Sequence, residues 1–253
     1  MFKPLVFLAG ALLSGSAFAA TEVLIVADEF PAMEWLATTL RTREGITSRV
    51  VAQTNLPPQL ASFSAVIVYI HGNLGAPTEQ ALIDYTRAGG KLIVLHHSIS
   101  SGKRKNAQWF KFLGVALPEG DVSQGGYKWI EPVTLDIVKL APAHFITTHQ
   151  VGYPARIGWR AVGAGTSEEP LPGFTLHDSE VYLNHVLTEP RTPLLGFRYT
   201  DVKSGQVWMQ CHAGWVKTAD RGWIVYLLPG HSLKDFEHPT YTRIVLNAVT
   251  WKP

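Results

Sequence analysis

The clearest structural signal in this sequence is the stretch Gly89-Gly90-Lys91-Leu92-Ile93-Val94-Leu95-His96-His97-Ser98. A glycine often follows the end of a helix, because it adopts the left-handed backbone that closes the last turn. The uninterrupted apolar run after the glycine pair is typical of a strand buried on both faces of a parallel sheet. We therefore predict a strand at residues 91–95 that ends in a sharp elbow and delivers two histidines to the carboxyl edge of a sheet.

Similar patterns lie on both sides of this stretch. Upstream, the sequence predicts strands at 23–27, 50–52 and 65–70 and helices at 31–40 and 78–85. This order of elements predicts an α/β fold with a doubly wound, mostly parallel sheet and helices on both faces. Downstream, it predicts a helix at 108–113, a strand at 129–138, a Gly- and Pro-rich loop at 152–175, strands at 194–199, 206–210 and 223–228, and a last helix from 239.

The first 19 residues have the pattern of a secretory signal peptide. Met1-Phe2-Lys3 is a short basic start, residues 5–13 are mainly apolar, and Ala17-Phe18-Ala19 is a small-x-small cleavage site. The apolar stretch is shorter than the roughly 20 residues that a membrane-spanning helix needs. We expect cleavage after Ala19, a periplasmic or secreted protein without membrane attachment after cleavage, and one domain at 20–253.

The composition is that of a globular domain, with 46% hydrophobic and 17% charged residues and a formal net charge of +2. No long basic run is present, which argues against a nucleic-acid partner. The one basic cluster, Lys103-Arg104-Lys105, is interpreted as a solvated loop. Cys211 is the only cysteine, so the chain cannot form an internal disulfide. Eight Trp and eight Tyr offer flat faces on which sugars could stack.

Ionisable side chains directly follow the apolar strands. In chain order they are Asp28-Glu29, His71, His96-His97 and, shortly after the last predicted strand, His231. Because the carboxyl ends of parallel strands border one crevice, we expect these side chains to share a binding cleft. Histidine can act there as acid, base or metal ligand near neutral pH. Adjacent residues on an extended backbone point to opposite faces, so only one of His96 and His97 is expected to enter the cleft.

Other kinds of site have less support in the sequence. Ser98 beside a histidine could be a nucleophile, but no orienting acid can be assigned to it. The residues around Ser101-Gly102-Lys103 do not complete a phosphate loop, and no G-x-G-x-x-G follows a strand, so nicotinamide binding is unsupported. Cys211 falls in a late strand rather than at the elbow, which favours a core role over a nucleophile.

The elbow stretch resembles the trehalose-utilisation (ThuA-like) family, and other segments agree with it. They are Leu171-Pro172-Gly173-Phe174, the acidic segment Asp178-Ser179-Glu180-Val181-Tyr182-Leu183-Asn184 with Ser179 as an apparent insertion, Pro193-Leu194-Leu195-Gly196, His212-Ala213-Gly214-Trp215, and Tyr226-Leu227-Leu228-Pro229-Gly230-His231-Ser232. The resemblance covers nearly all of residues 20–253 and is weak at 114–165. It implies a fold similar to the class I glutamine amidotransferases, with histidine at the elbow where those enzymes carry a catalytic cysteine.

The resemblance also implies which residues form the site. The elbow supplies His96 or His97, the acidic segment supplies Glu180 and Tyr182, and the Gly-His after the last strand supplies His231. We expect His97, His96 and Glu180 to be catalytic. We expect substrate to be bound by His71, Tyr182, His231 and Asp28.

The sequence leaves open whether the site binds a metal ion. Potential ligands are more numerous than a single ion needs: His71, His96, His97, His185, His212, His231 and Glu180. No H-E-x-x-H or H-x-x-E-H spacing is present. These ligand types suit a divalent ion such as zinc, but they do not identify which residues would bind it.

The resemblance implies a carbohydrate-metabolism enzyme that acts on a disaccharide or its 3-keto derivative, with a small-molecule carbohydrate as partner. A keto group acidifies the neighbouring C–H, so Glu180 could remove that proton while His96 or His97 stabilises the enediolate. Isomerisation, elimination or cleavage would follow. The alternative is an exported sugar-binding module without catalysis. A thiol-dependent relative of the amidotransferases is a weaker alternative.

Overall fold

The fold is built on one large mixed sheet, seen in a computed structural model that describes residues 22–160 and 165–253. Its strand order is β2-β1-β3-β4-β12-β11-β10-β6-β8-β7. The strands are β1 (Glu22–Ala27), β2 (Thr47–Val51), β3 (Ala65–Tyr69), β4 (Lys91–Leu95), β6 (Lys128–Lys139), β7 (Ala155–Trp159), β8 (Glu169–Leu183), β10 (Thr192–Thr200), β11 (Val207–Ala219) and β12 (Gly222–Leu227). A separate small pair joins β5 (Val115–Ala116) to β9 (Val186–Leu187).

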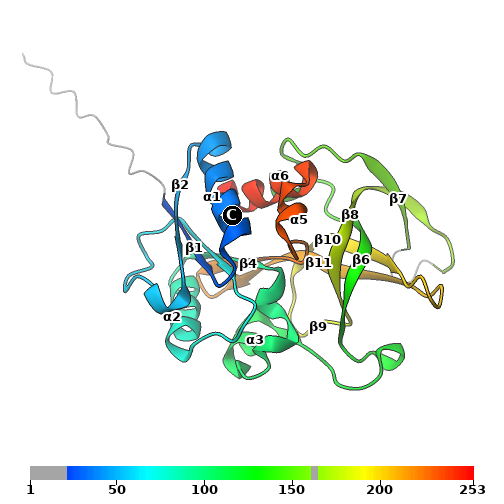
Figure 1. The fold of residues 1–253 in the computed structure, drawn as a ribbon, viewed down its shortest axis with the longest axis horizontal. Coiled ribbons are helices and arrows are strands. Elements are labelled where there is room, and N and C mark those ends of the chain that lie inside the picture. Colours follow the sequence, from blue (N-terminus) through cyan, green and yellow to red (C-terminus); the bar gives the residue numbers. More distant parts are fainter. Residues whose placement is uncertain (1–21, 161–164) are drawn as a thin grey trace, which may run out of the picture.

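Helices cover both faces of the sheet, as the sequence predicted. Figure 1 shows α1, α5 and α6 on one side of the sheet and α2 and α3 on the other. The helices are α1 (Phe30–Glu44), α2 (Ala76–Arg87), α3 (Ala107–Leu113), α4 (Phe145–Thr148), α5 (Leu233–Glu237) and α6 (Pro239–Thr250), with short 3-10 turns η1 (Gln53–Asn55), η2 (His96–Ile99), η3 (Ser101–Lys103) and η4 (Val122–Gln124). Among the described residues, no helix is both long and apolar enough to cross a membrane.

The five strands β2, β1, β3, β4 and β12 form a parallel half-sheet. Its central strands are apolar throughout because both of their faces are covered, and residues 23–27 and 92–95 are fully buried. The predicted strands at 91–95 and 223–228 thus pair with each other, although they lie far apart in the chain. This half of the prediction is confirmed.

The other half of the sheet is antiparallel, so the expectation of a mostly parallel sheet was wrong. In the described sheet, five of the strand pairs are antiparallel and four are parallel. Part of the physical reason is the connections, because parallel neighbours need a crossover of a dozen or more residues. The loops that join β7 to β8, β10 to β11 and β11 to β12 are shorter than that. Only Asp220 and Arg221 separate β11 from β12, with Asp220 at φ 51° in the turn.

The prediction of a loop at 152–175 is also wrong, because this segment contains β7 and the first part of β8. Glycine and proline were interpreted as breakers, but here they occupy strand positions. A Cβ on Gly173 would lie 2.4 Å from the carbonyl oxygen of Ile137, so glycine permits close cross-strand packing. Pro170 and Pro172 lie opposite the edge strand β7. The expected signal peptide at 1–19 lies outside the described residues.

Candidate functional site

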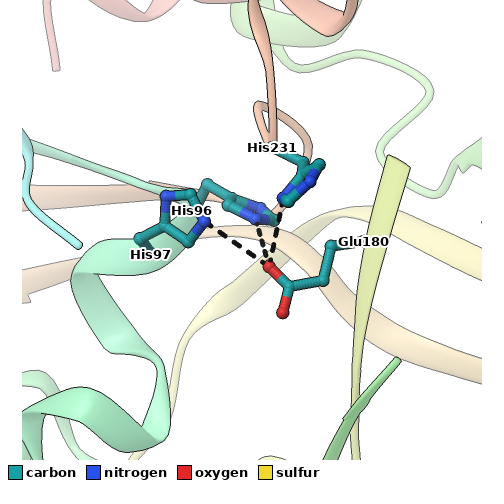
Figure 2. Close-up of side chains that lie close together, drawn as sticks. All are labelled: His96, His97, Glu180 and His231. Atoms are coloured by element: carbon teal, nitrogen blue, oxygen red, sulfur yellow. Dashed lines mark hydrogen bonds and ion pairs between the residues drawn. The ribbon is translucent and has the colours of Figure 1, made fainter. Parts of the chain in front are cut away.

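Four side chains from different elements converge above the carboxyl end of β4 (Figure 2). His96 and His97 begin the 3-10 turn η2, directly after β4. His231 follows the end of β12, the neighbour of β4 in the sheet. Glu180 comes from β8 in the antiparallel half of the sheet. We call His96, His97, Glu180 and His231 the imidazole cluster.

The elbow after β4 is strained, because His96 has φ 41°, in the left-handed region that non-glycine residues seldom adopt. The chain enters a 3-10 turn there instead of staying extended. Both rings therefore reach the same carboxylate: Nε2 of His96 lies 2.8 Å and Nε2 of His97 lies 3.6 Å from Oε2 of Glu180. The expectation that the two rings point to opposite faces was wrong for this reason.

The outer ring nitrogens of the cluster also face acceptors. Nδ1 of His96 donates to the carbonyl oxygen of Leu228 at 2.5 Å. His231 has Nε2 3.0 Å from Oε2 of Glu131 and Nδ1 3.4 Å from Oε2 of Glu180. For His97, Nδ1 lies 3.8 Å from Oε2 of Glu29. Each imidazole thus lies between Glu180 and a second acceptor group.

Glu180 carries the negative charge at the centre of the cluster. Burial raises the pKa of its carboxyl group, but His231, His96 and the hydroxyl of Tyr182, which donates at 2.9 Å, outweigh burial and hold that pKa well below its usual range. The Glu180 carboxylate in turn raises the pKa of His231. Burial and the neighbouring His96 lower the pKa of His97 strongly, so this ring is neutral at physiological pH.

A cavity of about 410 Å³ opens beside the cluster. Its lining is polar and aromatic: Glu29, His71, His97, Ser100, Ser101, Gly102, Trp129, Glu131, Glu180, Tyr182 and His231. His96 is fully buried behind this lining and contacts it through Glu180, His97 and Tyr182. Of the two elbow histidines only His97 lines the cavity, as the sequence analysis expected. A hollow of about 460 Å³ near α2 and α3 contains no member of the cluster, so the chemistry favours the smaller cavity.

The loop that carries His231 is held by a buried aspartate. Oδ2 of Asp235 accepts hydrogen bonds from the backbone N–H groups of Gly230 (3.0 Å) and His231 (2.9 Å) and from Oγ of Ser179 (2.7 Å). Ser179 directly precedes Glu180, so one carboxylate ties the loop to β8. The pairing of β6 with β8 is irregular on both sides of Ser179, as expected where a strand accommodates an extra residue.

Of the expected substrate-binding residues, His71, Tyr182 and His231 line the cavity and Asp28 does not. His71 stacks on His97 at 4.4 Å between ring centroids. Both carboxylate oxygens of Asp28 accept backbone N–H groups, from His71 at 2.7 Å and Gly72 at 2.9 Å. Asp28 therefore shapes the loop after β3, and its neighbour Glu29 faces the cavity.

The residues that sequence reasoning missed include Trp129 and Glu131, which line the cavity, and Lys103, which holds the backbone of His71 and His97. Alternation along the predicted strand at 129–138 would have placed Trp129 and Glu131 on one face. The interpretation of Lys103 as solvated was wrong, because it is fully buried. Its Nζ donates to the carbonyl oxygens of Ile70, of His71 at 2.7 Å and of His97 at 2.5 Å. Burial lowers the pKa of Lys103 to about 7.

Two groups among the described residues bring metal-ligating atoms within 4.8 Å of one another: the imidazole cluster, and Glu29 with His71 and His97. His185 and His212 belong to neither group. They pack together with ring centroids 5.0 Å apart. Cys211 lies in β11 and does not line the cavity.

The model of the trehalose-utilisation (ThuA) family matches residues 18–252. The chain belongs to the ThuA family. This confirms the resemblance inferred from the elbow and the C-terminal motifs. No curated protein matches the sequence of this ThuA chain.

Solved structures agree with the family at the level of fold. A ThuA-like protein from Bacteroides uniformis has a TM-score of 0.63 and 14% identity, with 94% of each chain covered. One from Parabacteroides merdae has a TM-score of 0.64 and 10% identity, with 92% of this chain and 89% of that chain covered. A protein from Salmonella typhimurium described as cytoplasmic has a TM-score of 0.55 and 16% identity, with 90% of this chain and 99% of that chain covered.

The buried pair His185 and His212 makes the stability of this ThuA protein depend on pH. Burial holds the pKa of His185 well below its ordinary 6.5 and lowers the pKa of His212 to about 4. Below about pH 6.5 the unfolded chain therefore binds more protons than the folded chain, and stability falls as the pH falls. Each such histidine contributes a slope of up to roughly 1.4 kcal/mol per pH unit.

We expect His185→Leu to reduce the change of unfolding free energy with pH by up to roughly 1.4 kcal/mol per pH unit, the contribution of one proton. Urea unfolding between about pH 6.5 and about pH 5 measures this change. The matched control is His177→Leu, because His177 is exposed on β8. An unchanged slope in the His185 variant would contradict the assignment.

Proposed function

We propose that this ThuA protein is an exported carbohydrate enzyme that acts on a disaccharide or its 3-keto derivative. The observation that supports the proposal is the composition of the cavity. Trp129, with 48% of its surface exposed, lies at the same cavity as three carboxylates and three imidazoles. An aromatic face can stack on a sugar ring, while the ionisable groups can bind its hydroxyls and move a proton.

The proposed reaction begins at the carbon next to the keto group. A carboxylate accepts the proton of this C–H bond, and the electron pair of the bond forms an enediolate. The imidazole cluster stabilises the negative oxygen of the enediolate. Return of a proton to the neighbouring carbon gives isomerisation, and departure of the substituent on the next carbon gives elimination and separates the sugars.

The geometry suggests a division of roles that differs from the one inferred from sequence. Glu180 was assigned as the base, but its low pKa and its contacts with three imidazoles and the Tyr182 hydroxyl suit it better to orient the imidazoles. His97 remains the electrophile, since it is neutral and lines the cavity. The proposed base is one of the two partly exposed carboxylates of the lining, Glu131 or Glu29.

The test is to incubate the purified protein with paired native and 3-keto disaccharides and to identify the products by mass spectrometry and NMR. Selective consumption of the keto sugar supports the proposal, and Glu131→Gln and Glu29→Gln then show which carboxylate is the base. If no product forms while sugars still raise the melting temperature, the protein is a binding module. If neither occurs, the carbohydrate assignment is wrong.

Trp129→Ala is expected to weaken sugar binding roughly 10-fold, the effect of one lost stacking contact of about 1.4 kcal/mol. The matched control is Trp208→Ala, because Trp208 stacks on Tyr199 and does not line the cavity. Titration calorimetry measures both variants. Equal affinities for the wild type and the Trp129 variant would remove this residue from the sugar site.

Export is part of this proposal and has its own test. The full-length gene is expressed in a Gram-negative host, and the N-terminus of the protein in the periplasmic fraction is determined by mass spectrometry. We expect the chain to begin at Ala20. An intact Met1 in the cytoplasmic fraction would contradict export.

A further inference from the structure

We propose that the imidazole cluster binds one divalent transition-metal ion, with Nε2 of His96, Nε2 of His97, Nδ1 of His231 and Oε2 of Glu180 as ligands. The inference concerns the cavity of the proposed function and rests on that function only for the role of the ion. Binding is measured without sugar, so the two proposals can fail separately.

Ring protonation supplies the first argument. Nδ1 of His96 faces a carbonyl oxygen at 2.5 Å, so it must carry the ring proton. In the neutral ring Nε2 then has a lone pair, which points at a carboxylate oxygen only 2.8 Å away. The Tyr182 hydroxyl has one proton and donates it to Glu180, so it does not separate these two atoms. Either a second ring proton on Nε2 or a metal cation between Nε2 and Oε2 resolves the contact, and the metal accounts for the other two rings as well.

His231 and His97 repeat the arrangement. Nε2 of His231 lies 3.0 Å from the Glu131 carboxylate, so in the neutral ring Nε2 carries the proton and the lone pair of Nδ1 faces Glu180. In the described part of the chain, this buried Nδ1 has no hydrogen-bond partner. Nε2 of His97 faces Glu180 while its Nδ1 lies toward Glu29. An outer nitrogen held by a carbonyl or carboxylate is the usual second shell of a metal-binding histidine.

The distances support the same conclusion. Ligands at 2.0–2.1 Å from a tetrahedral ion lie about 3.4 Å from one another. Oε2 of Glu180 is 3.4 Å from Nδ1 of His231 and 3.6 Å from Nε2 of His97. The third separation, 2.8 Å to Nε2 of His96, must open by about half an ångström when the ion replaces the hydrogen bond.

Ligand chemistry and position indicate the kind of ion. Three imidazoles and a carboxylate suit zinc, cobalt, nickel or iron(II) rather than magnesium or calcium. His97, His231 and Glu180 line the cavity while His96 lies behind them, so a fifth ligand, added when the tetrahedral ion expands its coordination, would come from the cavity. An ion there would act on a sugar oxygen as a Lewis acid.

Glu29, His71 and His97 form the competing group. Side chains of Glu29 and His71 are 41% and 64% exposed, whereas those of His96 and Glu180 are almost fully buried. A cation is attracted more strongly to a carboxylate in a buried site, because the effective dielectric constant there is lower than in water. We therefore assign the ion to the imidazole cluster, and His71→Ala distinguishes the two groups.

The experiment uses the purified protein, stripped with a chelator and titrated with Zn²⁺ by calorimetry and with Co²⁺ by visible absorption. We expect one ion per chain, and a loss of affinity of about 100-fold or more in His231→Ala and Glu180→Gln. His71→Ala and the exposed control His177→Ala should bind as the wild type does. Circular dichroism verifies folding, and His231→Gln replaces the alanine variant if that one does not fold.

Three outcomes would overturn the proposal. The wild type binds neither ion, or His71→Ala loses binding while His231→Ala retains it, or every variant binds equally. If the ion binds as expected and no sugar is consumed, the metal site stands and only the proposed reaction fails.

Discussion

Glu180→Gln is expected to fold and to lose about 1,000-fold or more in kcat/KM on the keto sugar, the upper range for removal of one electrostatic group from an active site. Glutamine fills the same space in β8, but it places an uncharged amide among three imidazoles. The charge that raises the pKa of His231 disappears, and an NH₂ group can face Nε2 of His96, which is 2.8 Å from Oε2 in the native site. Steady-state kinetics on the confirmed substrate measure the effect.

The control for this prediction is Glu119→Gln, because the Glu119 side chain is 89% exposed and lies outside the cavity lining. This variant should keep the wild-type rate. Unchanged thermal unfolding of Glu180→Gln shows that the loss is chemical. A Glu180 variant within a few-fold of the wild-type rate would remove the carboxylate from the catalytic machinery.

Asp235→Ala is expected to cost about 3 kcal/mol or more of unfolding free energy and to lower turnover as well. Asp235 is buried and its Oδ2 accepts three hydrogen bonds, two of them from backbone N–H groups that have no other acceptor in the loop. Each donor left unpaired inside the protein costs roughly 1–3 kcal/mol. The loop after β12 would then move and take His231 away from Glu180. Urea unfolding and steady-state kinetics measure the two effects.

Two further variants separate the contributions at Asp235. Asn at this position keeps an acceptor oxygen without the charge, so Asp235→Asn should lose less stability than the alanine variant. Ser179→Ala removes one donor and leaves both backbone contacts, so it should cost only about 1 kcal/mol. If Asp235→Ala were as stable and active as Ser179→Ala, the carboxylate would not hold the loop.

Local sequence pattern predicted the parallel half of the fold because its central strands are apolar runs. The same patterns located His71, His96, His97 and His231, since the edge at which a parallel strand ends follows from the position of the strand alone. The carbohydrate-related family was also accessible from motifs.

The features that the sequence did not reveal depend on contacts between segments that lie far apart in the chain. Glu180 was found only through the acidic motif, because nothing local brings β8 to the elbow. Glu131 and Trp129 were not found as site residues, although their strand was predicted. The turn conformation of His96 depends on packing around the elbow, so the extended-chain argument for two opposite ring directions failed. Lys103 looked solvated because its carbonyl partners come from two other segments.

The position of β12 has a consequence for the synthesis of the protein. This strand is translated last but lies between β4 and β11, and it alone joins the two halves of the sheet. Until residue 227 has left the ribosome, the nascent chain exposes two unpaired strand edges, which are templates for aggregation. Premature termination anywhere before β12 should therefore yield insoluble fragments rather than a smaller folded product. During refolding, activity should return only when β12 pairs with β4 and β11.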